Sequence, residues 1–282
     1  MNNEALRAWI GRQEIREDLA TAAPLNGMAA TLDHQAAQVY ALGDIVPPLW
    51  HWTYFLPTPR QSQLGTDGHP VKGGLLPPIT LPRRMWAGSQ IEFLRPLYVG
   101  EKIARRSTIS DVSYKEGRTG SLAFVKLRHE TSNAGGVAIV ENQDIVYRNP
   151  PKPGEGPATP TIARTDAQWR RKVQPTAPLL FRYSALTFNG HRIHYDRPYA
   201  EREEGYSGLV VHGPLIATLL LDLLRSELPD ARVVAYDFRA VRPLLDTTTF
   251  EVCGRTSEDG TVSLWAMDSE GFLATSATAR LA

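Results

Sequence analysis

The feature that most constrains the fold of this chain is an internal repeat. The segment QIEFLRPL at residues 90–97 recurs in character as DFRAVRPL at residues 237–244, with Arg-Pro-Leu displaced by 147 positions. Each copy is followed by a polar turn and by three more segments whose alternating or β-branched residues are typical of antiparallel strands. The two predicted strand series are residues 88–95, 102–114, 121–131 and 136–147, and residues 232–241, 248–255, 261–268 and 272–280. Such a repeat predicts two similar halves.

A buried helix is predicted before the second strand series. The run LIATLLLDLL at residues 215–224 is apolar nearly all round, with only Thr218 and Asp222 as exceptions, so this helix is expected in the core. Pro214 suits the first helical position, which makes Gly213 the predicted N-cap. No comparable helix precedes the first series, so we expect that half to have shortened or lost it. The predicted fold class is α+β, with antiparallel sheets each curled around a central helix.

The Pro-rich segment at residues 149–160 is the predicted boundary between the halves. It contains five prolines, which exclude a helix or a central strand, and we interpret it as a linker between residues 1–148 and residues 161–282. Outside the strand series, the sequence predicts an amphipathic helix, a second helix and a long Gly- and Pro-rich loop, at residues 1–20, 32–42 and 57–83. Loops of that length are usually functional or mobile.

Composition and charge exclude several classes of protein. Lys and Arg number 31 against 30 Asp and Glu, a net charge of +1, so no global electrostatic attraction to nucleic acid or to an anionic membrane is expected. The single cysteine, Cys253, excludes an intrachain disulfide, and its strand-like setting predicts a buried thiol. The N-terminus lacks the apolar region of a signal peptide and no run approaches 18 apolar residues. We therefore expect a cytoplasmic protein without a membrane span.

Polar residues that could form a site gather just before the predicted core helix. Three of the seven histidines, His191, His194 and His212, lie within residues 181–224. The N-terminus of the helix carries unpaired backbone N–H groups and the positive end of the helix dipole, which suit an oxygen that gains negative charge. The spacing H-x-x-H-x-D, which ends at Asp196, matches no established zinc pattern, so no metal site is predicted.

The amino-acid sequence of this region resembles that of a known family. The segment TFNGHRIHYD at residues 187–196, followed by Val211-His212-Gly213, resembles the MaoC-like, or R-specific enoyl-CoA hydratase 2, family, whose loop reads S-G-D-x-N-P-[IL]-H-x-D and whose helix opens with V-H-G. That resemblance implies a tandem, or double, hot-dog fold with a degenerate N-terminal half and a catalytic C-terminal half. The loop, the WIGR motif near the start and the chain length are most similar to the branch with mesaconyl-C4-CoA hydratase, itaconyl-CoA hydratase and type 2 hydroxyacyl-thioester dehydratases.

The resemblance implies addition of water to an enoyl-CoA thioester, or its removal. His194 occupies the family's catalytic histidine position and is the expected base. Asn189 replaces the acidic partner of the family's pair; it cannot exchange a proton but can orient water, and its lack of charge should lower the pKa of His194. The Gly213 N–H is the expected donor to the thioester oxygen. His191 and His212 are candidate substrate contacts, although His212 also fits a packing role. No cofactor is expected beyond the coenzyme A of the substrate.

The resemblance further implies a branched C5 dicarboxylic substrate, itaconyl-CoA or mesaconyl-C4-CoA, converted to citramalyl-CoA in itaconate or mesaconate breakdown. An arginine suits the free carboxylate, and Arg192 is the local candidate. Candidates for the CoA phosphates are Arg83, Arg84, Arg239 and Arg242. The aromatic run that contains Trp50, Trp52 and Phe55 is either core or a pocket wall.

Alternatives remain open at this stage. A dehydratase of longer R-3-hydroxyacyl thioesters would have an apolar tunnel instead of a buried arginine. A thioesterase would need an acidic residue at the acyl carbon, and Asp196 and Glu201 are not obviously placed for that role. A third alternative is a non-catalytic acyl-CoA-binding subunit, which the loss of the usual Asp suggests. A homodimer is the expected assembly.

Overall fold

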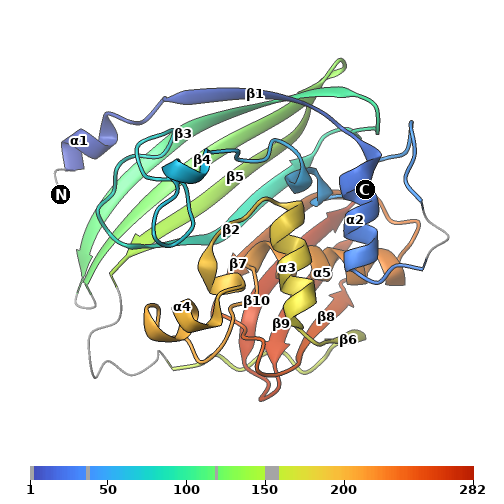
Figure 1. The fold of residues 1–282 in the computed structure, drawn as a ribbon. Coiled ribbons are helices and arrows are strands. Elements are labelled where there is room, and N and C mark those ends of the chain that lie inside the picture. The colour runs from blue at the N-terminus through green and yellow to red at the C-terminus, as the bar shows by residue number, and fades with distance from the viewer. Residues whose placement is uncertain (1–2, 36–38, 118–119, 150–158) are drawn as a thin grey trace.

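The strands form one continuous antiparallel sheet in the computed structural model, which describes residues 3–35, 39–117, 120–149 and 159–282. Its strand order is β1-β3-β4-β5-β2-β7-β10-β9-β8-β6. The first five strands come from the N-terminal half: β1 (Gln13–Leu19), β2 (Arg83–Phe93), β3 (Lys102–Gly117), β4 (Gly120–Asn133) and β5 (Gly136–Arg148). The other five come from the C-terminal half: β6 (Trp169–Val173), β7 (Val233–Ala240), β8 (Phe250–Thr256), β9 (Thr261–Asp268) and β10 (Leu273–Leu281). Both predicted strand series are confirmed (Figure 1).

The repeat lies at the centre of the sheet. Strands β2 and β7, which carry the two copies, pair with each other and join the halves. The backbone N–H groups of Leu94 and Arg95 both donate to the carbonyl of Ala138, and those of Val241 and Arg242 donate in the same way to Ala274. A Cβ on Gly88 would lie 2.3 Å from the Phe238 carbonyl oxygen, so this seam requires glycine. The two copies of the repeat therefore have the same local structure.

The core helix is α5 (Gly213–Glu227), and its residues 215–224 are all buried. It packs against β6, β8, β9 and β10, and the hydroxyl of Tyr236 on β7 donates to the Ala217 carbonyl at 3.1 Å. The predicted start is correct to one residue: the N-cap is His212, whose extended backbone places its carbonyl to accept from Ile216 N–H, and Gly213 is the first helical residue. The carboxylate of Asp222, although buried, is bound by His34 and Arg171.

The N-terminal half has no counterpart of α5. The short helices α2 (Ala22–Thr31) and α3 (Ala177–Leu186) precede the corresponding regions of the two halves and lie side by side (Figure 1). Between α2 and β2, the described residues form only the 3-10 turns η1 (Trp50–Thr53) and η2 (Gln61–Gln63). The expected loss of the N-terminal helix and the expected long loop are thus both confirmed.

Two predicted helices are wrong. Residues 1–20 form a short helix α1 (Asn3–Arg7) and then strand β1, which pairs with β3 along its whole length. The apolar side chains of Ile15 and Leu19 are exposed, so no apolar face drives helix formation there, and the unpaired edge of β3 gains a partner instead. The described residues of segment 32–42 are not helical, because α2 ends before them and Asp33 has a positive φ of 62°. Residues 150–158 of the predicted linker lie outside the described residues, and the boundaries at 148 and 161 remain predictions.

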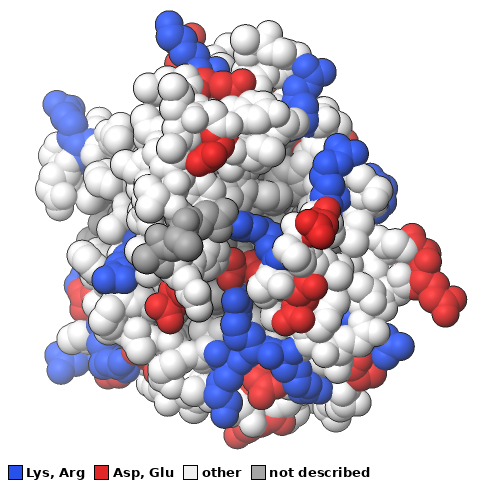
Figure 2. Space-filling view, turned by 90° about the vertical axis from the view of Figure 1, so that its right-hand side faces the viewer, with Lys and Arg blue, Asp and Glu red and all other residues white. Residues whose placement is uncertain are grey.

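The surface and the cysteine agree with the sequence interpretation. Basic and acidic side chains are interspersed over most of the face in Figure 2, in line with the small net charge. Cys253 on β8 is fully buried, and burial raises the pKa of its thiol to about 11. Among the described residues, no helix combines the length and apolar character needed to cross a membrane.

Candidate functional site

The candidate site is built on the loop between α3 and the short helix α4 (Arg197–Arg202). The loop turns at Phe188, whose φ is 49°, and is held where the N–H of Asn189 donates to the Ser184 carbonyl at 2.8 Å. The side-chain oxygen of Asn189 accepts from the His191 N–H at 3.0 Å. Asn189 therefore shapes the loop, and only its side-chain NH₂ group remains to meet a water or substrate.

His194 is buried in the 3-10 turn η3 (Arg192–His194) with one ring nitrogen bound. Its Nδ1 lies 2.7 Å from the Val210 carbonyl oxygen. Because a carbonyl can only accept, Nδ1 carries the proton and Nε2 keeps a lone pair. Burial lowers the pKa of His194 to about 4, so the ring is neutral at pH 7 and can act as a base.

His212 packs directly against His194. The two rings stack with centroids 3.7 Å apart at 19°. His212 is only 1% exposed, and its Nε2 lies 2.8 Å from the Ser184 hydroxyl. Its Nδ1 has no hydrogen-bond partner among the described residues. This placement matches the packing role considered for His212.

Gly213 brings the N-terminus of α5 to the same place. It follows His212 directly and is the first residue of the helix. A Cβ built on Gly213 would meet no atom within 4 Å, so open space lies in front of it. The site thus combines an unprotonated imidazole nitrogen with helix N–H groups beside open space, which suits a reacting carbonyl.

The N-terminal half contributes Asp67 and His69, which the sequence analysis missed. The ring of His69 lies 4.0 Å from the ring of His191, and its Nδ1 lies 3.0 Å from Oδ2 of Asp67. His191 in turn lies 5.5 Å from His194. The only signal was the TDGHP wording inside the long predicted loop, and nothing in the sequence places that loop against residues more than 100 positions away.

Electrostatics keep this cluster of histidines neutral. Burial lowers the pKa of His69; the hydrogen bond with Asp67 opposes that effect, and the charge of Arg84 adds to it. Burial, followed by the neighbouring His69 and His194, lowers the pKa of His191 to about 2. Burial tends to raise the pKa of Asp67, but the hydrogen bond and charge of His69 outweigh it and hold that pKa below its usual range. Asp67 is therefore the ionised member.

These shifts predict an acid-sensitive fold. His69, His191, His194 and His212 all have pKa values below that of an unfolded histidine, about 6.5, so the unfolded state binds more protons as pH falls. The free energy of unfolding should be highest above about pH 6.5 and should decrease as pH falls toward 4. Urea unfolding at pH 7, 6 and 5 measures this dependence, and His194→Asn should make it shallower. Stability that is flat over this range would contradict the neutral cluster.

Arg84 and Lys72 add positive charge beside the cluster. The charge of Arg84 lowers the pKa of both His69 and His191, which places its guanidinium within electrostatic reach of both rings. Arg84 pairs with Tyr147 across β2 and β5, and the Lys72 ammonium lies 5.8 Å from the Tyr147 ring. Among the described residues, neither cation forms an ion pair with a carboxylate.

The other candidate arginines are engaged elsewhere. Arg192 binds Asp196 through Nε and Nη2 and the Thr66 carbonyl through Nη1, so it ties the two loops together. Arg83 forms an ion pair with Glu204 at 3.0 Å. Arg239 is exposed on β7, on the opposite face from the buried Tyr236 and Phe238, and Arg242 pairs with Asp268 at 2.9 Å. The structure does not bring Arg83, Arg239 or Arg242 to the histidine cluster.

The candidate aromatic wall is part of the core. Trp50 is 1% exposed and packs against Tyr40 and the guanidinium of Arg225. The indole N–H of Trp52 donates to the buried Glu141 carboxylate at 3.0 Å. The interpretation of this aromatic run as part of the core is therefore confirmed for Trp50.

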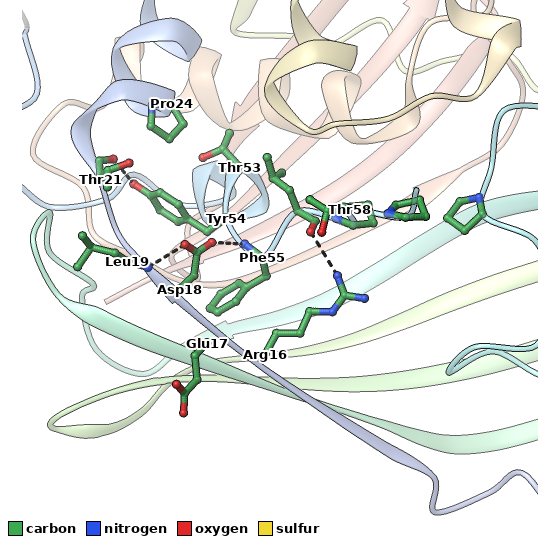
Figure 3. Close-up of a pocket in the computed structure, with 14 residues that line it drawn as sticks. Arg16, Glu17, Asp18, Leu19, Thr21, Pro24, Thr53, Tyr54, Phe55 and Thr58 are labelled. Atoms are coloured by element: carbon green, nitrogen blue, oxygen red, sulfur yellow. Dashed lines mark hydrogen bonds between the residues drawn. The ribbon is translucent and has the colours of Figure 1, made fainter. Parts of the chain in front are cut away.

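A cleft of about 820 Å³ lies beside the N-terminal half. Figure 3 shows its lining by β1 and the segment that follows η1, with Asp18 bound to Phe55 N–H and Arg16 to the Leu56 carbonyl. Its lining includes Phe55 of the candidate aromatic run but none of the candidate histidines or arginines, and it approaches the histidine cluster through Pro70, which follows His69. The histidine cluster, not this cleft, is the candidate site.

Comparisons with known proteins place the chain in a family. Residues 49–246 match the model of hydroxyacyl-thioester dehydratase type 2. The chain is 45% identical over 281 residues to mesaconyl-C(4)-CoA hydratase of Chloroflexus aurantiacus, covering 100% of this chain and 99% of the relative.

Solved structures show the same fold at low identity. A MaoC-like dehydratase of Phytophthora capsici has a TM-score of 0.71 at 14% identity, covering 100% of this chain and 98% of that one. A Mycobacterium tuberculosis protein described as having a double hotdog fold has a TM-score of 0.58 at 13% identity, covering 97% and 96%. The predicted tandem hot-dog fold is confirmed. With matches over most of its length, the chain belongs to the hydroxyacyl-thioester dehydratase type 2 family.

Proposed function

We propose that this protein is a hydro-lyase that adds water to the double bond of a branched C5 dicarboxylic enoyl-CoA thioester, mesaconyl-C4-CoA or itaconyl-CoA, to form citramalyl-CoA. Family membership supports hydration or dehydration of an acyl thioester, and the 45% identical relative is named a mesaconyl-C(4)-CoA hydratase. The observation that carries the dicarboxylic assignment is the presence of Arg84 and Lys72, without a carboxylate partner, beside the histidine cluster.

The residues of the site support a stepwise role for each group. The thioester oxygen accepts from Gly213 N–H at the helix N-terminus, where a donor of this kind stabilises the enolate-like oxygen by about 3–4 kcal/mol. His194 Nε2 accepts a proton from water while the water oxygen attacks the β-carbon. The π electrons move toward the thioester oxygen, and the enolate then takes the proton back from His194 at the α-carbon. No cofactor enters these steps beyond the coenzyme A of the substrate.

The free carboxylate of the substrate is assigned to Arg84, with Lys72 at the rim. Arg192, the sequence candidate, already binds Asp196 in a bidentate contact and is therefore saturated. Arg84 is half-buried, and its cross-strand neighbour Tyr147 is a buried side chain whose hydroxyl interacts with the Arg84 guanidinium. A substrate carboxylate would neutralise the cation and could accept from that hydroxyl.

The same charges make the rival functions less suitable. A long fatty-acyl chain would desolvate Arg84 without pairing it, which is costly. A thioesterase needs a free carboxylate at the acyl carbon, whereas Asp196 caps α4 and binds Arg192. A purely binding subunit would not need the unprotonated Nε2 of His194. A homodimer in the cytoplasm is part of the proposal, and sedimentation of the purified protein tests its assembly.

Substitution of Arg84 tests the substrate class. Arg84→Met should lower kcat/KM for mesaconyl-C4-CoA and itaconyl-CoA by about 10- to 100-fold, because a charged hydrogen bond contributes about 1.5–3 kcal/mol. Hydration of crotonyl-CoA, which lacks the second carboxylate, should change little. Arg239→Met, at an exposed arginine on β7, is the matched control. Rates are measured by mass-resolved hydration, and an equal loss on all three thioesters would contradict this role for Arg84.

A further inference from the structure

The loop that carries Asp67 and His69 is fitted closely to the loop that carries His191. The N–H of Arg192 donates to the Asp67 carbonyl at 2.9 Å, and Arg192 Nη1 donates to the Thr66 carbonyl at 2.9 Å. Gly68 has a φ of 85°, and a Cβ there would lie 1.9 Å from the Gly190 carbonyl oxygen. One backbone–backbone and one side chain–backbone hydrogen bond thus join the two loops, so the position of His69 at the site is a built feature of the fold.

Hydration at this site lacks one group to hold the attacking water. That water has two hydrogens, of which His194 removes one and can return it to the α-carbon, so the second hydrogen is left to be bound. Asn189 stands where the family resemblance expects a carboxylate, but its side-chain oxygen is already engaged by the His191 N–H. A second acceptor for the water would therefore have to come from another segment.

His69 and Asp67 have the arrangement of such a group. One oxygen of Asp67 accepts from the backbone N–H of His69 and the other lies 3.0 Å from its Nδ1, so the carboxylate holds the ring in one orientation. A carboxylate can only accept from Nδ1–H, which leaves the lone pair on Nε2. His194 is in the same tautomer through the Val210 carbonyl. The ring centroid of His191 is 4.0 Å from that of His69 and 5.5 Å from that of His194.

We propose that His69 is a second catalytic residue, positioned by Asp67, whose Nε2 holds the attacking water while His194 takes its proton. This proposal rests on the hydration reaction proposed above. Two Nε2 lone pairs accept the two water hydrogens, which directs the water oxygen at the β-carbon.

The proton and electron changes balance within the site. A water O–H bond breaks toward His194 Nε2 as the oxygen forms a bond to the β-carbon, while the second O–H bond stays intact and donates to His69 Nε2. The π pair of the double bond moves onto the thioester, whose oxygen is bound by Gly213 N–H. The imidazolium then returns its proton to the α-carbon as the thioester carbonyl reforms. No oxidant, reductant or further reactant is needed.

A metal centre is the competing use of the same residues. Asp67, His69 and His191 each offer a ligand atom, and these atoms lie within 4.8 Å of one another. However, the Asp67–His69 hydrogen bond places a proton on Nδ1, and His69 then offers only Nε2 to a cation. Catalysis by His69 with Asp67 and a metal centre at the same residues predict opposite effects of a chelator. The experiment distinguishes the two by adding one.

The test compares the full-length wild type with His69→Ala, His69→Gly, Asp67→Asn and the loop control Val71→Ala, whose side chain is exposed. We expect kcat to fall by about 100-fold in His69→Ala and Asp67→Asn, with KM changed only a few-fold, because misplacing a reacting group by about 1 Å can cost about 100-fold. Added imidazole should restore part of the activity of His69→Gly. Val71→Ala should match the wild type.

The outcomes separate this proposal from the proposed function. Wild-type turnover of mesaconyl-C4-CoA, itaconyl-CoA or crotonyl-CoA reports the function itself, whereas the ratio of variant to wild type reports His69. A His69→Ala enzyme within about fivefold of the wild type would overturn the proposal, since loss of a group that positions the attacking water should cost far more. Loss of wild-type activity with a chelator, restored by a divalent metal, would overturn it in favour of a metal centre. Imidazole rescue supports it, because a merely structural residue is not replaced by free imidazole.

Discussion

Replacing His194 with alanine is expected to lower kcat for hydration by about 100- to 10,000-fold, the range for loss of a general base. The ring is buried, and its Nδ1 is tied to the Val210 carbonyl, beside the N-terminus of α5. His194→Asn is the matched variant, because its amide nitrogen can keep the bond to the Val210 carbonyl while offering no titratable base. Both variants should be equally inactive, and His194→Asn should keep its thermal stability. Activity of His194→Asn above about a tenth of wild type would contradict the role of His194 as the base.

The pH dependence has a defined sign. His194 is active only when neutral, and burial lowers its pKa to about 4. The kcat/KM of wild type should therefore show no acid limb near pH 6.5, the usual histidine value, and should decrease only as pH falls toward 4. Measurements between pH 5 and 8 on protein shown to be folded at each pH check this. A limb centred near 6.5 would mean that the base is a solvent-exposed histidine instead.

Gly68→Ala is expected to produce the second large effect, although the residue performs no chemistry. An alanine at φ 85° costs about 1–2 kcal/mol of stability. Its Cβ would also collide with the Gly190 carbonyl oxygen, so the loop that holds His69 must move away from the loop that holds His191. Displacement of a catalytic group by about 1 Å can reduce kcat by about 100-fold.

Gly73→Ala separates the two contributions. Gly73 lies in the same loop with a φ of 112°, but a Cβ there meets no atom within 4 Å. This control should lose similar stability to backbone strain and keep nearly full activity. Thermal melting and kcat are measured for both variants. If Gly73→Ala lost as much activity as Gly68→Ala, general loosening of the loop would explain the effect and the specific contact with Gly190 would not.

Local patterns were sufficient for the sheet and the core helix. The apolar run at residues 215–224 can be buried only inside a sheet, and the strand series follow from alternation and turn residues, so both agree with the structure. The N-terminal helix prediction was wrong because Ile15 and Leu19 look like a helix face in sequence, whereas the free edge of β3 determines their conformation. Edge pairing is a long-range interaction, and helical periodicity cannot detect it.

Periodicity, turn residues and motif residues are local properties, so they were enough to predict the two halves, the buried helix and the histidine loop before it. The charged groups that meet in the site could be identified only from the tertiary structure. Arg192 lies in the motif but is saturated by Asp196 four residues away, while Arg84 reaches the cluster from β2. Asp67 and His69 reach His191 only because one continuous sheet holds the two halves together and Gly68 lets the loops touch. Contacts between residues this distant in sequence depend on how the sheet folds the chain back on itself, and no local pattern encodes that.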